Sequence, residues 1–587
     1  MKRKLNSILL GTVAIAMGFL MLKSTLYFAA SRIYHADECQ NVFVARILAL
    51  GQAQEYFTSI SLSLMPLVWL AREAVQSAEL FASARLVALL IFWLNLLLVA
   101  LATGEKLASW RGVFAFVGAA TLAPLWDYGF EIRHDNLLLT GLLFIWCLMR
   151  LRPPGVAAYA ILGGLMVALL FTGFKSFVYT IPLALAFLVL PPPGVAVARW
   201  KLGLAWAIGA FAMFLTVRLA YGAGGIWDVY LSGFQMVSEA SGGLGRFPPW
   251  KTLGRLLTQT PLLLALVFGA VVAVGSELGR RGRAALVWSG LLPETVFFVI
   301  ALAALLVNPA PHPYNLVNLV PFAYLLAYRY GISVVAEVWA QPVFRPIIFT
   351  LLLFAHFVPF YNATRRHLDW PNHRQENLMR VAEQLTDPVK DPVYDGIGMV
   401  PTRKSIHFHW FLHSLNINNF GKSGDLRVRD MLAENPAAVI IQSYRTDWLP
   451  EEDHEFIRQR YVPLADDFWV LGQMLPAGGG EFEIHHPGRY HLAPKEVSNL
   501  AGTYESSLKA LLESRKQPVA EPKVEPEFVA TLNGAPLTNR TVELPVGTYR
   551  LETAADCSPT VVWAGPKLKQ APRVSGSDRR RLFVNWY

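Results

Sequence analysis

Long apolar segments recur along this chain and constrain its fold more than any other feature. A bilayer core of about 30 Å needs about 20 mostly apolar residues for one helix. Eleven segments approach that template and are predicted to be membrane helices, near residues 6–29, 84–103, 112–126, 135–150, 155–173, 176–191, 201–221, 256–276, 293–307, 314–331 and 343–361. The pattern predicts a polytopic α-helical membrane protein.

Composition excludes the other broad classes. Of the 587 residues, 54% are hydrophobic and 16% are charged, whereas a soluble domain carries roughly 25% charged residues. The 12% of aromatic residues argues against disorder and collagen-like repeats. The formal net charge of +10 comes from basic residues that stand singly or in short groups between apolar runs, so membrane orientation explains it better than nucleic-acid binding.

The positions of the basic residues predict the orientation of the chain. Lys and Arg gather in alternate short loops on the cytoplasmic side of membrane proteins, and here they recur at Lys106 and Arg111, Arg150 and Arg152, Arg199 and Lys201, Arg280, Arg281 and Arg283, and Arg345. The N-terminus, with Lys2, Arg3 and Lys4, is then cytoplasmic, and residues beyond about 362 lie outside. A cleaved signal peptide at residues 1–22 is the alternative reading of the start.

The composition changes after the last apolar run. Residues 1–362 are predicted to form the transmembrane domain, and residues 363–477 alternate amphipathic stretches with short apolar runs, which favours an extracytoplasmic α/β domain. Residues 478–587 alternate around glycine turns and predict a small β-rich domain, with a helical or linker-like insertion at 505–526. The three cysteines, Cys39, Cys147 and Cys557, are too scattered for a disulfide framework.

Ionisable residues at the outer ends of the predicted helices form the candidate site, because such residues are costly in a membrane protein unless they have a role. A carboxylate can accept the proton of an attacking hydroxyl, and cations can stabilise charge on a departing phosphate. The candidates from acidic and basic outer loops are Asp37, Glu38, Arg133, Asp135, Lys175, His312 and Tyr314. The same ingredients fit glycosyl transfer from a lipid phosphate.

These residues resemble the GT-C glycosyltransferases of the protein O-mannosyltransferase and lipid A aminoarabinose transferase type. The likeness lies in the acidic pair Asp37–Glu38 of the first outer loop and in Arg133 and Asp135 before a leucine-rich helix. The turn 172–175 is similar to the family's Thr-Lys-Gly segment, although the order of Gly and Lys is changed. His312, Tyr314 and Pro321 resemble a late basic residue followed by Tyr and Pro.

The resemblance implies a function and roles for these residues. An acid of the first outer loop, Asp37, would be the catalytic base, with Glu38 and Asp135 as further catalytic candidates, and Arg133, Lys175, His312 and Tyr314 would bind the donor phosphate. The implied donor is a polyprenyl-phosphate sugar, the reaction inverts the anomeric centre, and the acceptor is a lipid, glycan or protein of the envelope. The implied location is a bacterial-type inner membrane. Some members bind a divalent metal, but this sequence offers no compact ligand cluster, so no metal ligand is assigned.

Other interpretations remain open at this stage. A transporter or flippase of lipid-linked sugars, or a non-catalytic scaffold of the envelope, would also gather cations at the membrane edge. The histidines His407, His409 and His413 suggest a metal site, but their spacing does not place all three on one face of a regular element. Pro293 and Glu294 are interpreted as a helix start, because Pro favours the first helical turn and Glu favours the positive helix end.

Overall fold

The structure is a computed structural model of the whole chain. It describes residues 2–56, 58, 60–151, 155–173, 176–189, 197–232, 235, 248–282, 291–308, 311–339, 345–368, 371–412, 427–465, 467–494, 528–566 and 582.

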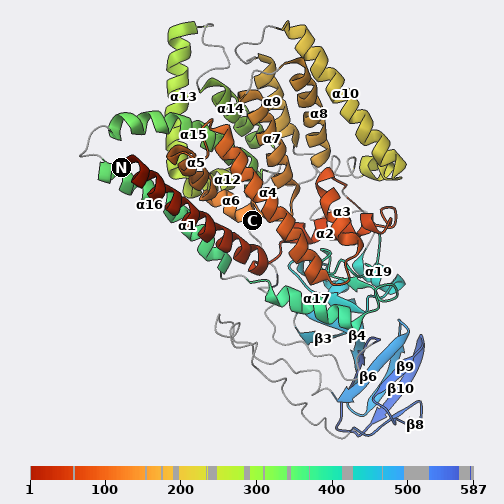
Figure 1. Cartoon of the computed structure of the whole chain (residues 1–587). Coiled ribbons are helices and arrows are strands. Elements are labelled where there is room, and N and C mark those ends of the chain that lie inside the picture. Colours follow the sequence, from red (N-terminus) through yellow and green to blue (C-terminus); the bar gives the residue numbers. More distant parts are fainter. Residues whose placement is uncertain are drawn as a thin grey trace.

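A bundle of helices forms the larger part of the molecule (Figure 1). Each of the eleven predicted segments overlaps one of its helices, namely α1 (Lys2–Ser31), α4 (Ser77–Ala102), α5 (Trp110–Ala120), α7 (His134–Leu151), α8 (Val156–Thr172), α9 (Phe177–Val189), α10 (Arg199–Ala223), α13 (Pro261–Arg281), α14 (Leu292–Val307), α15 (Leu316–Trp339) and α16 (Arg345–Leu368). In the described part of the chain, α4, α10 and α13 are long and apolar enough to cross a membrane. The count of eleven crossings stays a prediction.

The interpretation of Pro293 and Glu294 as a helix start is confirmed. Helix α14 begins at Leu292, with proline in its first positions and Glu294 in its first turn. The Glu294 carboxylate is buried and lies 3.3 Å from Nη2 of Arg150 on α7 and 2.5 Å from Nη1 of Arg329 on α15. This carboxylate therefore also joins three helices of the bundle.

A layer of short helices lies between the bundle and the C-terminal region (Figure 1). It contains α2 (Ala36–Ala49) and α3 (Met65–Arg72), which the apolar pattern did not predict because, at 14 and 8 residues, they are shorter than a membrane span. Three further short elements on the same side of the bundle are α6 (Ala123–Tyr128), α12 (Pro249–Gln259) and the 3-10 turn η4 (Pro313–Asn315). Asp37 and Glu38 lie on α2 and Tyr314 lies in η4, whereas Arg133 precedes α7 and Asp135 lies in its first turn.

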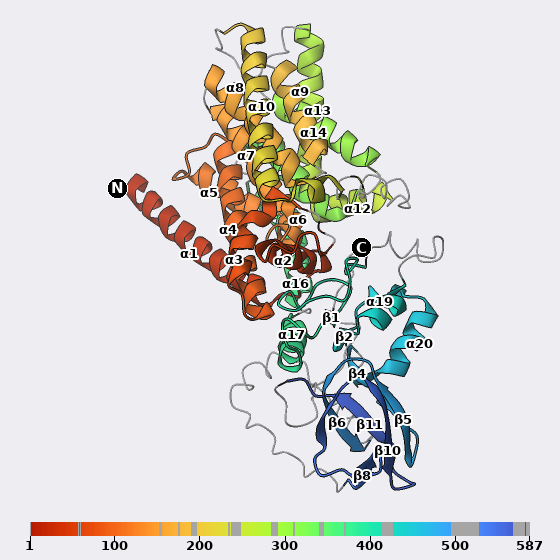
Figure 2. The ribbon, with the colours of Figure 1, turned by 90° about the vertical axis from the view of Figure 1, so that its right-hand side faces the viewer.

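The C-terminal region is built on two sheets (Figure 2). Its helices are α17 (His373–Leu385), α19 (Val428–Glu434) and α20 (Glu451–Arg460). The strands are β1 (Val393–Tyr394), β2 (Val439–Ile441), β3 (Tyr461–Ala465), β4 (Phe468–Met474), β5 (Gly479–Ile484), β6 (Gly488–Pro494), β7 (Ala530–Leu532), β8 (Ala535–Pro536), β9 (Thr541–Leu544), β10 (Gly547–Thr553) and β11 (Pro559–Trp563).

One sheet joins the two predicted outer domains. Its order is β1-β2-β4-β11-β6-β9, with β3 paired to β4, and the second sheet has the order β5-β10-β7-β8. Strand β11 pairs antiparallel with β4, so that Thr560 lies opposite Met474. The hydrogen bonding therefore continues across the predicted boundary near residue 477, and the placement of that boundary stays a prediction.

The C-terminal region packs directly on the layer of short helices. The backbone and amide groups of Tyr34 and Gln375 exchange two hydrogen bonds, of 2.7 and 2.9 Å. The rings of Phe43 on α2 and Trp410 lie 4.2 Å apart. Gly398 has φ +78°, and a Cβ there would lie 2.6 Å from Cβ of Phe43, so only glycine allows this approach. These contacts fix the C-terminal region beside the start of α2.

Candidate active site

The site begins at the first turn of α2, where a capping box fixes the backbone. His35 Nδ1 accepts a hydrogen bond from the Asp37 amide at 3.4 Å, and Glu38 Oε2 accepts one from the His35 amide at 2.8 Å. Burial lowers the pKa of His35 to about 4. The ring is therefore neutral near pH 7 and can accept this bond, which holds Asp37 at the helix N-terminus.

Glu38 is fully buried and is bound on all sides by structural partners. Its carboxylate accepts bonds of 2.9 and 2.7 Å from Arg85 on α4 and a bond of 3.1 Å from the Ile132 amide. Burial acts to raise the pKa of Glu38, but the charge and hydrogen bonds of Arg85 outweigh it and hold that pKa below its usual value. Glu38 therefore joins α2, α4 and the loop before α7.

Asp37 is the more accessible acid of the pair and faces a buried arginine. Its side chain is 29% exposed, and Oδ2 lies 2.5 Å from Nη1 of Arg133. Nε of Arg133 lies 3.2 Å from Oδ2 of Asp135, at the start of α7. The Arg133 guanidinium also lies 3.8 Å above the ring of Tyr314. Four predicted site residues, drawn from three separate segments, thus meet around one guanidinium.

The remaining candidates lie around this centre. The His312 ring stacks on that of Tyr314, with 5.3 Å between ring centroids. Lys175 lies outside the described residues. The turn just before it reaches the site, because a Cβ on Gly173 would lie 2.7 Å from the ring of His134 at the start of α7.

The loop after β2 in the C-terminal region approaches Asp37. Burial raises the pKa of the Tyr444 hydroxyl, Arg445 opposes that rise, and the negative charge of Asp37 adds to it. Tyr444 follows β2, so the loop between β2 and α20 lies within electrostatic range of Asp37.

Two buried arginines that sequence reasoning missed support the site. Arg32, at the end of α1, is ion-paired with Glu131 and donates a 2.7 Å bond to the Asp127 carbonyl. Arg85 holds Glu38 and the backbone carbonyls at the end of α1. Their signal was present, since both stand at the edge of an apolar run, where a charged residue requires a partner.

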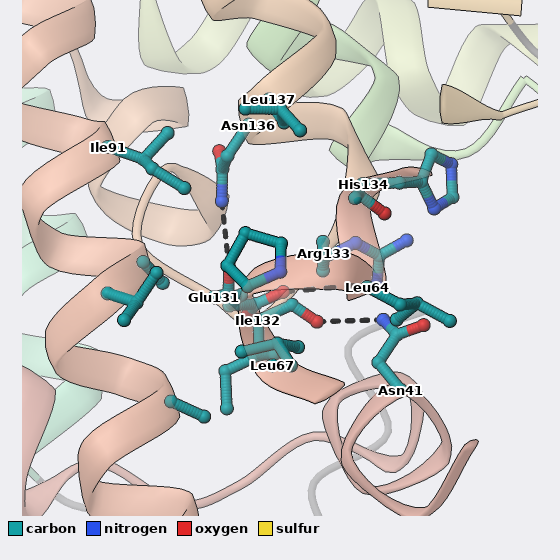
Figure 3. Close-up of a pocket in the computed structure, with 15 residues that line it drawn as sticks. Asn41, Leu64, Leu67, Ile91, Glu131, Ile132, Arg133, His134, Asn136 and Leu137 are labelled. Atoms are coloured by element: carbon teal, nitrogen blue, oxygen red, sulfur yellow. Dashed lines mark hydrogen bonds and ion pairs between the residues drawn. The ribbon is translucent and has the colours of Figure 1, made fainter. Parts of the chain in front are cut away.

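An apolar cleft opens beside Arg133 (Figure 3). The volume in it that a water molecule can enter is about 30 Å³. Its polar end carries Glu131, Arg133, His134 and Asn136. Side chains of α4, of the 3-10 turn η1 (Leu62–Leu64) and of α3 line the rest, among them Leu64, Leu67, Ala84, Val87, Ala88 and Ile91. The Asn136 amide donates a 2.7 Å bond to the Glu131 carbonyl and so fixes the polar end. The cleft therefore combines charged groups at one end with an apolar lining.

The described residues do not form an evident metal centre. No group of three or more His, Cys, Asp or Glu is arranged to hold a metal ion in the part of the chain that the structure describes. Asp37 and Asp135 both bind Arg133, so this carboxylate pair does not fit a divalent cation as it stands. The rings of His407 and His409 stack with 5.8 Å between centroids, and His413 lies outside the described residues.

Comparison with known proteins identifies the fold. No family model matches the chain, and no curated protein matches it. The solved structure of ArnT from Cupriavidus metallidurans in the apo state matches with a TM-score of 0.50 and 13% identity, over 78% of this chain and 97% of that chain. The chain has the GT-C fold.

Two further GT-C structures are similar at a lower score. ArnT bound to undecaprenyl phosphate matches with a TM-score of 0.47 and 14% identity, over 79% of this chain and 97% of that one. The Archaeoglobus fulgidus oligosaccharyltransferase in the apo form matches with a TM-score of 0.49 and 11% identity, over 93% and 95%. At such identities the likeness concerns the fold, and the chemistry must be argued from the residues of this chain.

Proposed function

We propose that the protein is a membrane glycosyltransferase that transfers a sugar from a polyprenyl-phosphate-linked donor to an acceptor of the cell envelope. One observation carries the proposal: a partly exposed carboxylate, Asp37, faces the buried guanidinium of Arg133 at the polar end of an apolar cleft. A base and an anion-binding group thus stand together beside an apolar surface. The GT-C fold and the resemblance of the outer loops to this enzyme class support the same reading.

In the proposed reaction the acceptor oxygen attacks the anomeric carbon directly and inverts it. The bond between that carbon and the phosphate oxygen breaks, and its electron pair stays on the phosphate. The acceptor proton passes to the Asp37 carboxylate. Positioned bases of this kind typically contribute about 10² to 10⁴ in rate. Asp135, which is buried and accepts from Arg133, orients that guanidinium in this scheme.

Arg133 is proposed to stabilise the charge that grows on the departing phosphate. A guanidinium presents a planar fork that matches phosphate oxygens. The Tyr314 ring below Arg133 keeps that fork in one plane, and His312 stacks on Tyr314. Lys175 is proposed to add a further positive charge from the turn between α8 and α9. The prenyl chain would follow the apolar walls formed by α4 and the η1–α3 segment.

We place the N-terminus in the cytoplasm and the C-terminal region on the outer side of a bacterial-type inner membrane, in keeping with the alternating basic loops. A polyprenyl carrier presents its head group at that surface. The donor then reaches Asp37 from the membrane, and the acceptor reaches it from the side of the C-terminal region.

A transfer assay tests this proposal. The purified protein is incubated with radiolabelled polyprenyl-phosphate sugars and membrane extract, and label is followed into the acceptor fraction. Wild type should transfer label, while Asp37→Asn should bind donor and transfer at least a hundredfold less. Asp430→Asn, on the exposed surface of α19, is the matched control and should behave as wild type. Movement of lipid-linked sugar across vesicles without transfer would support a flippase, and absence of both activities in wild type would leave a scaffold. Full transfer by Asp37→Asn would place the catalytic base on another residue.

A further inference from the structure

A second cleft is formed where the loop after α2 meets the C-terminal region, and its empty space, including the part open to solvent, is about 870 Å³. Glu55 and Tyr56 line it from that loop, and Lys390, Lys404, His407 and Phe408 line it from the C-terminal region. The Tyr56 ring lies 6.1 Å from that of Phe43, so the cleft lies beside the middle of α2.

The walls of this cleft are held by backbone contacts. The Lys404 carbonyl accepts a 2.9 Å bond from the Val393 amide on β1, and the Ile406 carbonyl accepts one of 2.9 Å from the Asn435 side chain. The Tyr56 hydroxyl lies 3.4 Å from the Ser405 carbonyl, across the junction of the two walls. The segment that carries Lys404 and Phe408 is therefore tied both to the sheet and to the loop after α2.

The side chains of the cleft combine positive charge with a flat apolar surface. Lys390 is exposed and Lys404 is half-buried, and Glu55 is the carboxylate among the lining residues. The charge of Lys390 also acts on Asp387 beside the cleft. Phe408 is 40% exposed and offers an aromatic ring to the cleft. His407 and Asn435 add hydrogen-bonding groups.

We propose that this cleft binds an anionic saccharide, as the part of the acceptor that lies away from the reacting hydroxyl. Ammonium groups bind carboxylate or phosphate as point charges, and an exposed aromatic ring offers a large, rigid contact surface for the apolar face of a sugar ring. Small-molecule sites have the same mixture of apolar surface and a few placed polar groups. The polar lining does not suit a prenyl chain. The binding of an anionic saccharide does not depend on the proposed function, but its identification as the acceptor does.

The position of the cleft limits the size of that acceptor. An acceptor that occupies the cleft and also reaches Asp37 must pass the six residues of α2 between Phe43 and Asp37, about 9 Å. The fitting acceptor is therefore a saccharide of more than one sugar ring. Both a carboxylate-bearing and a phosphate-bearing saccharide supply the required charge.

Binding measurements on the full-length purified protein test the inference. The probes are tetragalacturonate, neutral maltotetraose, a phosphorylated maltotetraose and inorganic phosphate. Wild type should bind both anionic saccharides at least tenfold more tightly than maltotetraose. Lys390→Ala/Lys404→Ala should lose at least tenfold of that affinity, and Phe408→Ala should weaken all saccharides. Arg550→Ala, an exposed cation on β10, is the control and should change nothing.

The outcomes separate the parts of the proposal. Tighter binding of one anionic saccharide than the other identifies the source of the charge. Equal binding by wild type and the double lysine variant would overturn the site, and so would inorganic phosphate that competes as strongly as the anionic saccharides. If the double variant unfolds, Lys390→Glu at the exposed position must show the same loss. Saccharide binding by a wild-type protein that transfers no sugar would overturn the proposed enzyme but leave the cleft intact.

Discussion

Neutralising Glu38 should lower the stability of the protein, whereas neutralising the adjacent Asp37 should lower its activity and leave its stability unchanged. Glu38 is 0% exposed, and it faces Arg85, which is 1% exposed, through two side-chain hydrogen bonds. Glu38→Gln keeps the size of the side chain but leaves the Arg85 guanidinium buried without its counter-ion. Removing one partner of a buried pair costs about 3–5 kcal/mol. Asp37→Asn leaves a partly exposed group that still accepts a hydrogen bond, so its cost should be below about 1 kcal/mol.

Thermal unfolding in detergent and sugar transfer distinguish these effects. The shift in Tm equals the lost free energy divided by an unfolding entropy of about 2.1 cal/mol/K per residue. For 587 residues the Tm of Glu38→Gln should therefore fall by about 2–4 °C. Asp37→Asn should keep its Tm while transfer falls at least a hundredfold. Glu38→Gln/Arg85→Met should cost less than the sum of its single variants, because the two residues interact. An unchanged Tm for Glu38→Gln, or a transfer rate above half of wild type for Asp37→Asn, would refute this assignment.

Further predictions address the anion site, the cap, the docking contact and the orientation. Arg133→Ala should weaken the binding of undecaprenyl phosphate at least tenfold, whereas the control Arg458→Ala, at an exposed position, should not. Equal affinities of the two variants would contradict the role of Arg133 in binding phosphate. The pKa of His35 is about 4 in the folded protein and 6.5 in the unfolded chain, so the folded state should lose stability as the pH falls from 6.5 to 4. In His35→Asn, which can still cap the helix, the Tm should fall less over that interval. Gly398→Ala should destabilise more than Gly51→Ala, which has a similar φ but open space around it. A reporter active only outside the cytoplasm should work after Thr386 and fail after Leu151.

The sequence allowed good prediction of features that repeat along the chain. Apolar runs predicted the bundle helices because a membrane core demands length and hydrophobicity. The same reasoning missed α2 and α3, which at 14 and 8 residues are too short to span a membrane core. Their contacts depend on the C-terminal region, which is more than 300 residues away in sequence and leaves no local signal.

The candidate site was predicted as a set of residues but not as a set of roles. Asp37, Arg133, Asp135 and Tyr314 lie together because helix ends on one side of a bundle converge. Glu38 could not be distinguished from Asp37 by sequence, since the difference comes from Arg85 on another helix. Adjacent residues on a helix point in different directions, and only packing decides which one meets solvent.

The pairing of β11 with β4 sets an order for the biogenesis of the outer region. Strand β4 ends at Met474, and its neighbour β11 begins at Pro559, near the end of the chain. A chain that emerges from the ribosome N-terminus first must deliver nearly all of its length before this sheet can close, and such long-range pairing is slow. Until then β4 presents an open edge, which favours aggregation. Loss of the final segment would therefore damage a sheet whose first strand, β1, begins at Val393.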